Sequence, residues 1–352
     1  MVALFYILLG LYLITLILLF IGIINIKPQK SQTFSSYKNF SIVVVYRNEK
    51  ENLPQLLLTF EKLDYPKENF EILMMDDGSD EVFDFSTYQL PIRSIKNKRI
   101  SASPKKDAIT LAVDYANHDW LVLTDADCLV NALWLKNLNN YLQKNTEKQM
   151  VCGSVFINKP HGFFSAFQAW DFVSLQATTI GSFGLNRPFM CNGANMAFTK
   201  TIFKTVDGYS GNNQMASGDD VFLLQKIFAV KPESLGFLFH SDFFVRTKAV
   251  NSFKHLIAQR ARWGIKAKAY SSIWGKYLSL LIVVISLVFV WRLIVLDFWF
   301  VSAKLFIDGL FLMYFAKQFG QKIKFLLPSL LFYPFMVVCI LWSSFFKMRW
   351  KA

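Results

Sequence analysis

Acidic side chains border apolar runs at four points of this 352-residue chain, three times after the run and once, at Asp219-Asp220, before it. They are Glu49, Asp76-Asp77, Asp125-Ala126-Asp127 and Asp219-Asp220. Each motif alone is weak evidence for chemistry, because a D-x-D arises by chance in a chain of this size and Asp-Asp before a helix is commonly a cap. Carboxylates gathered in one place, in contrast, create a negative potential that favours a hard divalent cation such as Mg²⁺ or Mn²⁺.

The elements that must position these residues alternate between strands and helices. Ser41–Tyr46, Phe70–Met75 and Trp120–Thr124 are predicted strands, Asn52–Leu63 and Lys106–Ala116 are predicted helices, and Thr87–Pro104 is a predicted loop-rich connector. This rhythm predicts an α/β fold with a mostly parallel sheet, in which ligands bind beyond the carboxyl ends of the strands. We therefore expect the acidic motifs to share one site.

The N-terminus carries no charge from Met1 to Ile26. As a helix this segment covers roughly 38 Å, enough to cross a bilayer with some tilt. A cleaved signal peptide is the alternative, but no basic residue precedes the run and the run is too long. Lys27, Lys30 and Lys38 follow it, which predicts a cytoplasmic location for the next domain.

The C-terminal third contains three further apolar segments, Tyr277–Leu296, Phe298–Phe315 and Phe325–Phe346. Lys304 and Asp308 interrupt the second segment at helical i,i+4 spacing, so they either pair with each other or contact a lipid phosphate. The predicted organisation is an anchor over residues 1–26, a cytoplasmic α/β domain over 40–268 and a membrane region over 274–346 with two to three segments. The topology of these last segments stays open.

Composition excludes several classes of protein. Hydrophobic residues make up 53% of the chain and charged residues 18%, which excludes intrinsic disorder. The formal net charge of +13 suits nucleic acid, an anionic membrane or a phosphate-bearing substrate. No finger or aromatic RNA-binding motif is present, so we expect no nucleic-acid partner.

Seven motifs in order carry a resemblance to a known family. They are Arg47-Asn48-Glu49, Asp76-Asp77-Gly78-Ser79, Lys105-Lys106-Asp107-Ala108, Asp125-Ala126-Asp127, Asn192-Gly193-Ala194-Asn195-Met196-Ala197, Gly218-Asp219-Asp220 and Gln259-Arg260-Ala261-Arg262-Trp263. From about Phe40 to Lys268 the chain resembles the membrane-bound family 2 glycosyltransferases of the cellulose-synthase and hyaluronan-synthase type, which have a GT-A domain and a Q-x-x-R-W motif. Asp219 stands where that family usually has Glu.

The resemblance implies inverting, metal-dependent transfer of a sugar from a nucleotide-diphosphate donor, expected to be a UDP-sugar. It implies Mg²⁺ or Mn²⁺ at Asp127 and Asp125, with Asp125 also toward the nucleotide. Further donor contacts are implied for Glu49, Asp77, Lys106 and Arg262.

The resemblance also implies the acceptor side of the reaction. Asp220 is the implied general base, beside Asp219 in the same acidic pair, and Gln259, Trp263 and Asn195 are implied to contact acceptor or product. The acceptor is a lipid, a glycolipid or a growing glycan, and the implied location is a bacterial inner membrane with its lipids as partners.

Two readings of the enzyme remain. At most four apolar segments offer little polar lumen for a polymer, which favours transfer of one or few sugars to a lipid-linked acceptor. A processive polysaccharide synthase, completed by a membrane partner or an oligomer, is the alternative. A non-catalytic scaffold and a basic membrane- or nucleic-acid-binding protein are more remote alternatives.

Overall fold

Two compact units make up the chain in the computed structural model, which describes residues 2–28, 36–215, 217–267 and 271–345. The sheet unit comprises Lys27–Phe156 and Met190–Lys248, and the helical unit comprises Met1–Ile26, Ile157–Phe189 and Ala249–Ala352. These bounds divide the stretch 40–268 that the sequence predicts as one domain. The predicted end points 268 and 346, like Lys30, lie outside the described residues.

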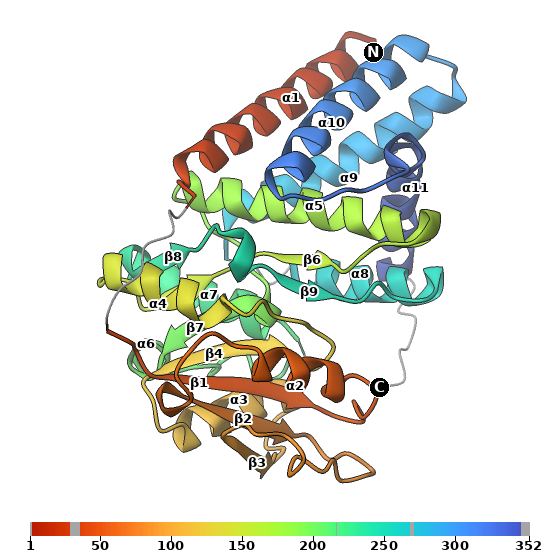
Figure 1. Ribbon diagram of the computed structural model, residues 1–352. Coiled ribbons are helices and arrows are strands. Elements are labelled where there is room, and N and C mark those ends of the chain that lie inside the picture. Colours follow the sequence, from red (N-terminus) through yellow and green to blue (C-terminus); the bar gives the residue numbers. More distant parts are fainter. Residues whose placement is uncertain (1, 29–35, 216, 268–270, 346–352) are drawn as a thin grey trace. The chain divides into compact units, whose positions relative to one another are not determined.

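The sheet unit is built on a seven-stranded sheet of order β3-β2-β1-β4-β7-β5-β8 (Figure 1). Its strands are β1 (Phe40–Tyr46), β2 (Phe70–Asp76), β3 (Ile92–Lys96), β4 (Trp120–Asp125), β5 (Met150–Cys152), β7 (Met196–Thr199) and β8 (Leu235–Phe237). β1, β2, β3 and β4 are parallel to one another, and β5 is parallel to β8, whereas β7 is antiparallel to β4 and β5. A two-stranded sheet of β6 (Val155–Ile157) and β9 (Val245–Thr247) completes the strands.

The register of the central strands brings the acidic motifs to one edge of the sheet. Tyr46 of β1 is paired with Asp76 of β2, and Val45 is paired with Asp125 of β4. β1 and β2 are buried along almost their whole length because they consist mainly of apolar residues covered on both faces. The carboxyl ends of three predicted strands therefore meet, as the sequence predicts.

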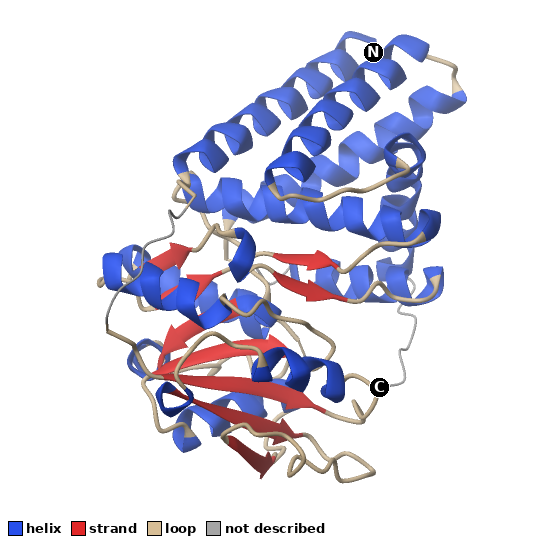
Figure 2. Cartoon of the chain, in the orientation of Figure 1, coloured by secondary structure: helices blue, strands red, loops and turns tan. Residues whose placement is uncertain are grey.

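Helices flank this sheet (Figure 2). They are α2 (Leu53–Glu61), α3 (Pro104–Tyr115), α4 (Trp134–Lys144), α6 (Lys200–Thr205) and α7 (Asp219–Val230). The predicted helices after β1 and before β4 are confirmed as α2 and α3, each with a proline in its first turn. The prediction of a loop-rich connector is wrong in part, because its middle forms β3, an edge strand with alternating exposed positions.

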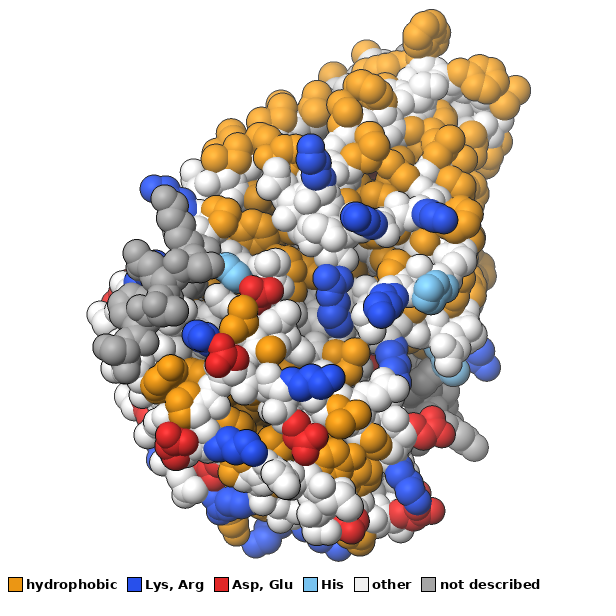
Figure 3. All heavy atoms as spheres, viewed as in Figure 1, with side chains coloured by type: hydrophobic (Ala, Val, Ile, Leu, Met, Phe, Trp, Pro, Cys, Tyr) orange, Lys and Arg blue, Asp and Glu red, His pale blue; other side chains and the backbone are white. Residues whose placement is uncertain are grey.

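The helical unit contains six helices in the part of the chain that the structure describes. They are α1 (Val2–Asn25), α5 (Gly162–Gly184), α8 (Phe253–Ala267), α9 (Ile273–Ile294), α10 (Phe298–Gln318) and α11 (Leu326–Phe345). Four of them, α1, α9, α10 and α11, are long and apolar enough to span a membrane. Large apolar side chains such as Leu4, Ile7, Trp299 and Phe306 are exposed on them, and hydrophobic side chains cover much of the visible surface of these helices in Figure 3. The chain thus has the character of a membrane protein.

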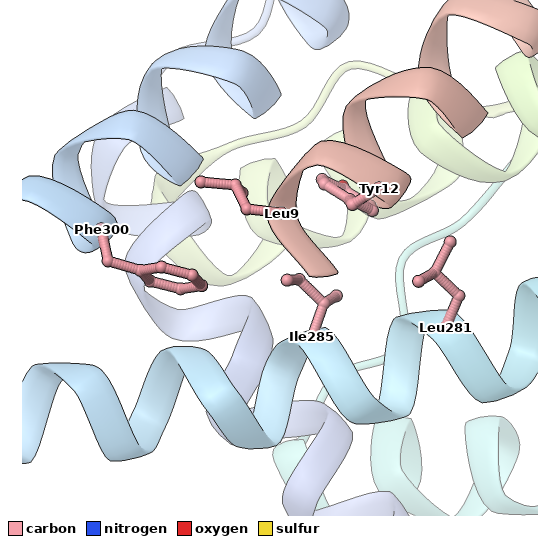
Figure 4. Close-up of a cluster of buried hydrophobic side chains, with 5 residues drawn as sticks. All are labelled: Leu9, Tyr12, Leu281, Ile285 and Phe300. Carbon is pink, nitrogen blue, oxygen red and sulfur yellow. The ribbon is translucent and has the colours of Figure 1, made fainter. Parts of the chain in front are cut away.

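Close packing joins the helices of this unit. α1 and α5 approach closely at Gly22 and Gly184, where a Cβ on Gly184 would overlap the carbonyl of Gly22. Elsewhere α1, α9 and α10 share a cluster of buried side chains (Figure 4), namely Leu9, Tyr12, Leu281, Ile285 and Phe300. Lys304 and Asp308 form a buried ion pair on α10, which confirms the first of the two readings of their spacing.

Candidate active site

A lysine and carboxylates from three elements meet beyond the carboxyl edge of the sheet. The Nζ atom of Lys105, on the first turn of α3, lies 2.7 Å from Oδ1 of Asp125 and 3.4 Å from Oδ2 of Asp219. Although burial alone would lower the pKa of Lys105, the nearby carboxylates of Asp125 and Asp219 raise it. Lys105 therefore stays cationic within an acidic cluster, where a phosphate-bearing ligand could also reach it.

Asp220 lies at the start of α7, next to the loop that precedes β7. Its Oδ2 atom accepts a hydrogen bond of 3.1 Å from the backbone N–H of Gly193, and its Oδ1 atom accepts one of 2.8 Å from that of Val221. Gly218 precedes the helix with a φ of 88°, a conformation that glycine adopts without strain. Two backbone donors and a helix N-terminus favour the ionised carboxylate that a general base requires.

Asp125 and Asp127 form the group best suited to a metal ion. One ligand atom each from Asp125, Asp127 and Cys128 lies within 4.8 Å of the others. Burial and the charge of Asp125 raise the pKa of Asp127, although Thr247 donates a hydrogen bond to its Oδ2 atom. Burial, with the same carboxylates, holds the pKa of the Cys128 thiol well above its usual value. The two carboxylates offer the oxygen ligands that Mg²⁺ and Mn²⁺ prefer, and the Cys128 thiol lies beside them.

The loops after β1 and β2 are joined by hydrogen bonds and carry the two predicted nucleoside contacts, Glu49 and Asp77. Both carboxylate oxygens of Asp77 bind Arg99, at 2.8 Å each, and Asn97 donates a third hydrogen bond of 2.7 Å. The carboxylate of Glu49 accepts a hydrogen bond from Asn52 at the start of α2. Arg99 is about half exposed, so a ligand at this position would meet the ion pair of Asp77 and Arg99 and not an isolated carboxylate.

Lys106 does not lie where a diphosphate contact requires it. Its side chain is buried, and its Nζ atom donates to the backbone carbonyls of Asn212 and Met215 at 2.6 and 3.0 Å. The same ammonium lies over the ring of Phe222. The structure assigns Lys106 to holding the segment before α7, and its neighbour Lys105 faces the carboxylates instead.

Asn195 is likewise fully buried, which does not fit the implied contact with acceptor or product. Its Oδ1 atom accepts a hydrogen bond from the indole of Trp134, and its Nδ2 atom donates to the carbonyls of Ser154 and Phe243. All of these partners belong to the sheet unit. Asn195 joins α4 to the segments that carry Ser154 and Phe243, and Gly193 is the member of its motif that contacts the acidic pair.

Gln259, Arg262 and Trp263 belong to α8 of the helical unit and not to the sheet unit. Arg262 is exposed, whereas Trp263 is partly covered by the guanidinium of Arg260, which lies 4.1 Å from its ring centroid. Arg260 also donates to Asp171 of α5 over 2.7 Å and to the side chain of Gln259 over 2.8 Å. The middle of the motif therefore anchors α8 to α5.

Sequence reasoning missed Lys105, Arg99 and Thr247 as members of the site. Lys105 had a detectable signal, since it adjoins Lys106 in the same motif, but the sequence does not show which of two adjacent lysines faces the carboxylates. Arg99 lies in the segment predicted as a loop. Thr247 lies on β9, and only the fold brings it to Asp127.

Comparisons with known proteins identify the family and the fold of the chain. The model of the family described as glycosyltransferase like family 2 matches residues 38–265, and the chain belongs to that family. No curated protein matches the chain. The mannosyltransferase PcManGT from Pyrobaculum calidifontis, solved with GDP-Man and Mn²⁺, is similar to it with 15% identity and a TM-score of 0.59 over 99% of this chain and 97% of that one. This likeness shows a GT-A type fold.

Other solved structures are less similar. TarS from S. aureus has 14% identity and a TM-score of 0.44, and the match covers 69% of this chain but only 42% of that one. Glucosyl-3-phosphoglycerate synthase from Mycobacterium tuberculosis, with Mn²⁺ and UDP, has 14% identity and a TM-score of 0.44 over 64% of this chain and 78% of that one.

Proposed function

We propose that this protein transfers a sugar, with inversion, from a nucleotide-diphosphate donor to a hydroxyl group of a lipid-linked or glycolipid acceptor at the cytoplasmic face of a membrane. The observation that carries the proposal is the meeting of Lys105, Asp125, Asp219 and Asp220 beyond the carboxyl ends of parallel strands. Membership of glycosyltransferase-like family 2 supports the reaction class, and the four candidate spans support the membrane location.

In this proposal, separate groups of residues bind the diphosphate and the nucleoside of the donor. Asp125 and Asp127 would hold a divalent cation, which when bound neutralises charge on the departing diphosphate. Lys105 supplies a further positive charge from the protein itself and replaces Lys106 in this role. Asp77, through the polar group it forms with Arg99, and Glu49 bind the nucleoside. The PcManGT structure contains Mn²⁺ and GDP-Man, which supports a divalent cation and a nucleotide-diphosphate donor. Because that donor carries guanine and the expected donor here carries uracil, both nucleotides must be tested.

Asp220 removes the proton from the acceptor hydroxyl. As the acceptor oxygen forms a bond to the anomeric carbon, the bond from that carbon to the diphosphate oxygen breaks on the opposite face, which inverts the configuration. The hydroxyl proton passes to the Asp220 carboxylate, whose position is set by the N–H groups of Gly193 and Val221. Asp219 forms an ion pair with Lys105 and so holds its ammonium group near the other carboxylates.

Residues of α8 supply the remaining contacts in this proposal. Arg262 is exposed and carries a guanidinium that suits a diphosphate. Gln259 and Trp263 contact the acceptor, with Trp263 held in place by Arg260. These roles rest on the motif that the residues share with the family.

The test is product analysis with the purified full-length chain in lipid nanodiscs. Radiolabelled UDP- and GDP-sugars are supplied singly, and the product is separated into lipid-extractable and polymeric fractions. We expect label from one donor in the lipid fraction, formed at least about a hundredfold more slowly with Asp220→Asn, a variant of the same shape. Label only in high-molecular-mass polymer supports the processive alternative, and no labelled product with any donor or acceptor contradicts the proposal.

A further inference from the structure

The helical unit contains a partly open cavity of about 80 Å³, and every residue that lines it belongs to this unit. Residues from α1, α5, α9, α10 and α11 line it. Much of the wall is apolar, but polar side chains also face the space: Tyr12, Asp171, Ser174, Thr178, Asp308 and Tyr333. Ionisable groups in a set of membrane helices are costly, and their presence around a cavity indicates a binding role.

The cavity wall contains two charged side chains, and both are carboxylates. Asp171 and Asp308 are 4% and 9% exposed. Arg260 binds Asp171 and Lys304 binds Asp308, but neither cation lines the cavity. The cations thus stabilise the carboxylates without presenting positive charge to the cavity.

The hydroxyl groups of the wall add further acceptors. Ser174 donates its proton to the carbonyl of Asp171, and Thr178 donates to the carbonyl of Ser174. Tyr12 donates to Oδ1 of Asp308 at 2.8 Å. Since the protons of these three hydroxyl groups are already used within the protein, their oxygen atoms face the cavity as acceptors. Together with the two carboxylates they favour a ligand that donates hydrogen bonds, which a hydroxyl group does and an ionised phosphate does not.

The position of the cavity within the unit suits the headgroup of a lipid. Its walls combine four candidate membrane spans with α5, which is not one of them and runs across the ends of α1 and α10 in Figure 1. Aromatic side chains such as Phe167, Trp170 and Phe311 provide apolar surface beside the carboxylates. Apolar surface with a few convergent acceptors is the chemistry that binds the hydroxyl-bearing end of an apolar molecule.

We propose that this cavity binds the uncharged, hydroxyl-bearing headgroup of a neutral lipid, such as a diacylglycerol or a glycolipid, and excludes lipids with a phosphate headgroup. That the bound lipid is the sugar acceptor rests on the proposed function. The binding itself does not, because it needs neither donor nor cation.

The experiment uses the full-length chain in nanodiscs without any sugar nucleotide. A photoreactive diacylglycerol and a photoreactive phosphatidic acid with identical acyl chains are crosslinked in parallel, and labelled peptides are mapped by mass spectrometry. We expect diacylglycerol to label peptides of α5, α10 or α11 at least about tenfold more than phosphatidic acid, because the two carboxylates line the cavity while their cations do not. Ser174→Leu, which fills the cavity, should remove this labelling. The matched Ser165→Leu, on the same helix but outside the lining, should retain it.

Equal or stronger labelling by phosphatidic acid overturns the proposal, as does labelling that Ser174→Leu leaves unchanged. Absence of labelling by both lipids also overturns it and indicates a cavity that holds only water. Thr178→Leu repeats the test if Ser174→Leu does not fold. Sugar-nucleotide binding is measured on the same samples, and its failure would count against the proposed function without altering the lipid result.

Discussion

Replacing Asp220 by Asn isolates the proposed proton transfer from every other part of the site. The Asn side chain has nearly the shape of Asp, and its amide oxygen can still accept the hydrogen bond of 3.1 Å that Gly193 donates. The segment between β7 and α7 should therefore keep its place. What the variant loses is the carboxylate that accepts the proton of the acceptor hydroxyl.

The expected loss is in the rate of transfer and not in the binding of the donor. Removing a general base typically costs about 10²–10⁴ in rate. Donor affinity should stay within a few-fold of the parent, because none of the proposed donor contacts is changed, and Lys105 keeps its ion pairs with Asp125 and Asp219 in this variant. The rate and the affinity should thus separate.

The assay measures sugar-nucleotide affinity by titration and the transfer rate by product formation, for Asp220→Asn and Asp219→Asn side by side. Asp219→Asn removes a buried partner of Lys105, so we expect lower thermal stability and a smaller loss of rate. A larger rate loss for Asp219→Asn than for Asp220→Asn would refute the assignment of the base. Near-normal transfer by Asp220→Asn would refute base catalysis at this position altogether.

Three further predictions follow from other parts of the sheet unit. Lys106→Met should lower the free energy of unfolding by about 1–3 kcal/mol, since two partly buried backbone carbonyls lose their donor, whereas Lys105→Met should mainly weaken nucleotide binding; thermal melting and nucleotide titration that gave the reverse pattern would contradict the assignment. Burial opposes ionisation of Glu71, but hydrogen bonds from Asn117 and Ser41 and the ion pair with Arg93 lower its pKa. Its stabilisation is therefore present above pH ~4.5 and lost as the pH falls below that value, so Glu71→Gln should lower the melting temperature at pH 7 and less at pH 4; an equal loss at both pH values would contradict this. Val82, which is 95% exposed, can be replaced by Cys in a chain without other cysteines; an impermeant maleimide should label it in lysed cells and not in intact ones, and labelling in intact cells would reverse the predicted topology.

The placement of the acidic motifs could be predicted from the sequence because it depends on short-range rules. Apolar strands of the β1 and β2 kind are recognisable as runs, and parallel strands bring their carboxyl ends to one edge. Asp125, which follows a predicted strand, therefore lies at the carboxyl edge of the sheet as predicted. The spans α1, α9, α10 and α11 were equally recognisable, because length and hydropathy alone define a candidate span.

Other features depend on how the elements dock, which a single sequence does not encode locally. Successive residues of a helix point about 100° apart, so the docking of α3 decides that Lys105 faces the carboxylates and Lys106 the protein interior. Asn195 follows a turn-forming motif, yet tertiary contacts with Trp134 bury it. α5 has buried side chains around most of its circumference, so it lacks the one-sided apolar pattern by which a surface helix is recognised in a sequence. It also belongs to the helical unit, although the segments before and after it in the sequence belong to the sheet unit.

The measurement that tests the central claim most directly is release of nucleoside diphosphate from UDP- and GDP-sugars by the purified full-length chain. It is made with Mn²⁺, with Mg²⁺ and with a chelator, on the parent chain and on Asp127→Asn. We predict release from one donor with a divalent cation, background release with the chelator, and a severe loss with Asp127→Asn while the melting temperature shows a folded protein. Release that the chelator and Asp127→Asn leave unchanged at saturating donor, or no release from any donor, would contradict the account.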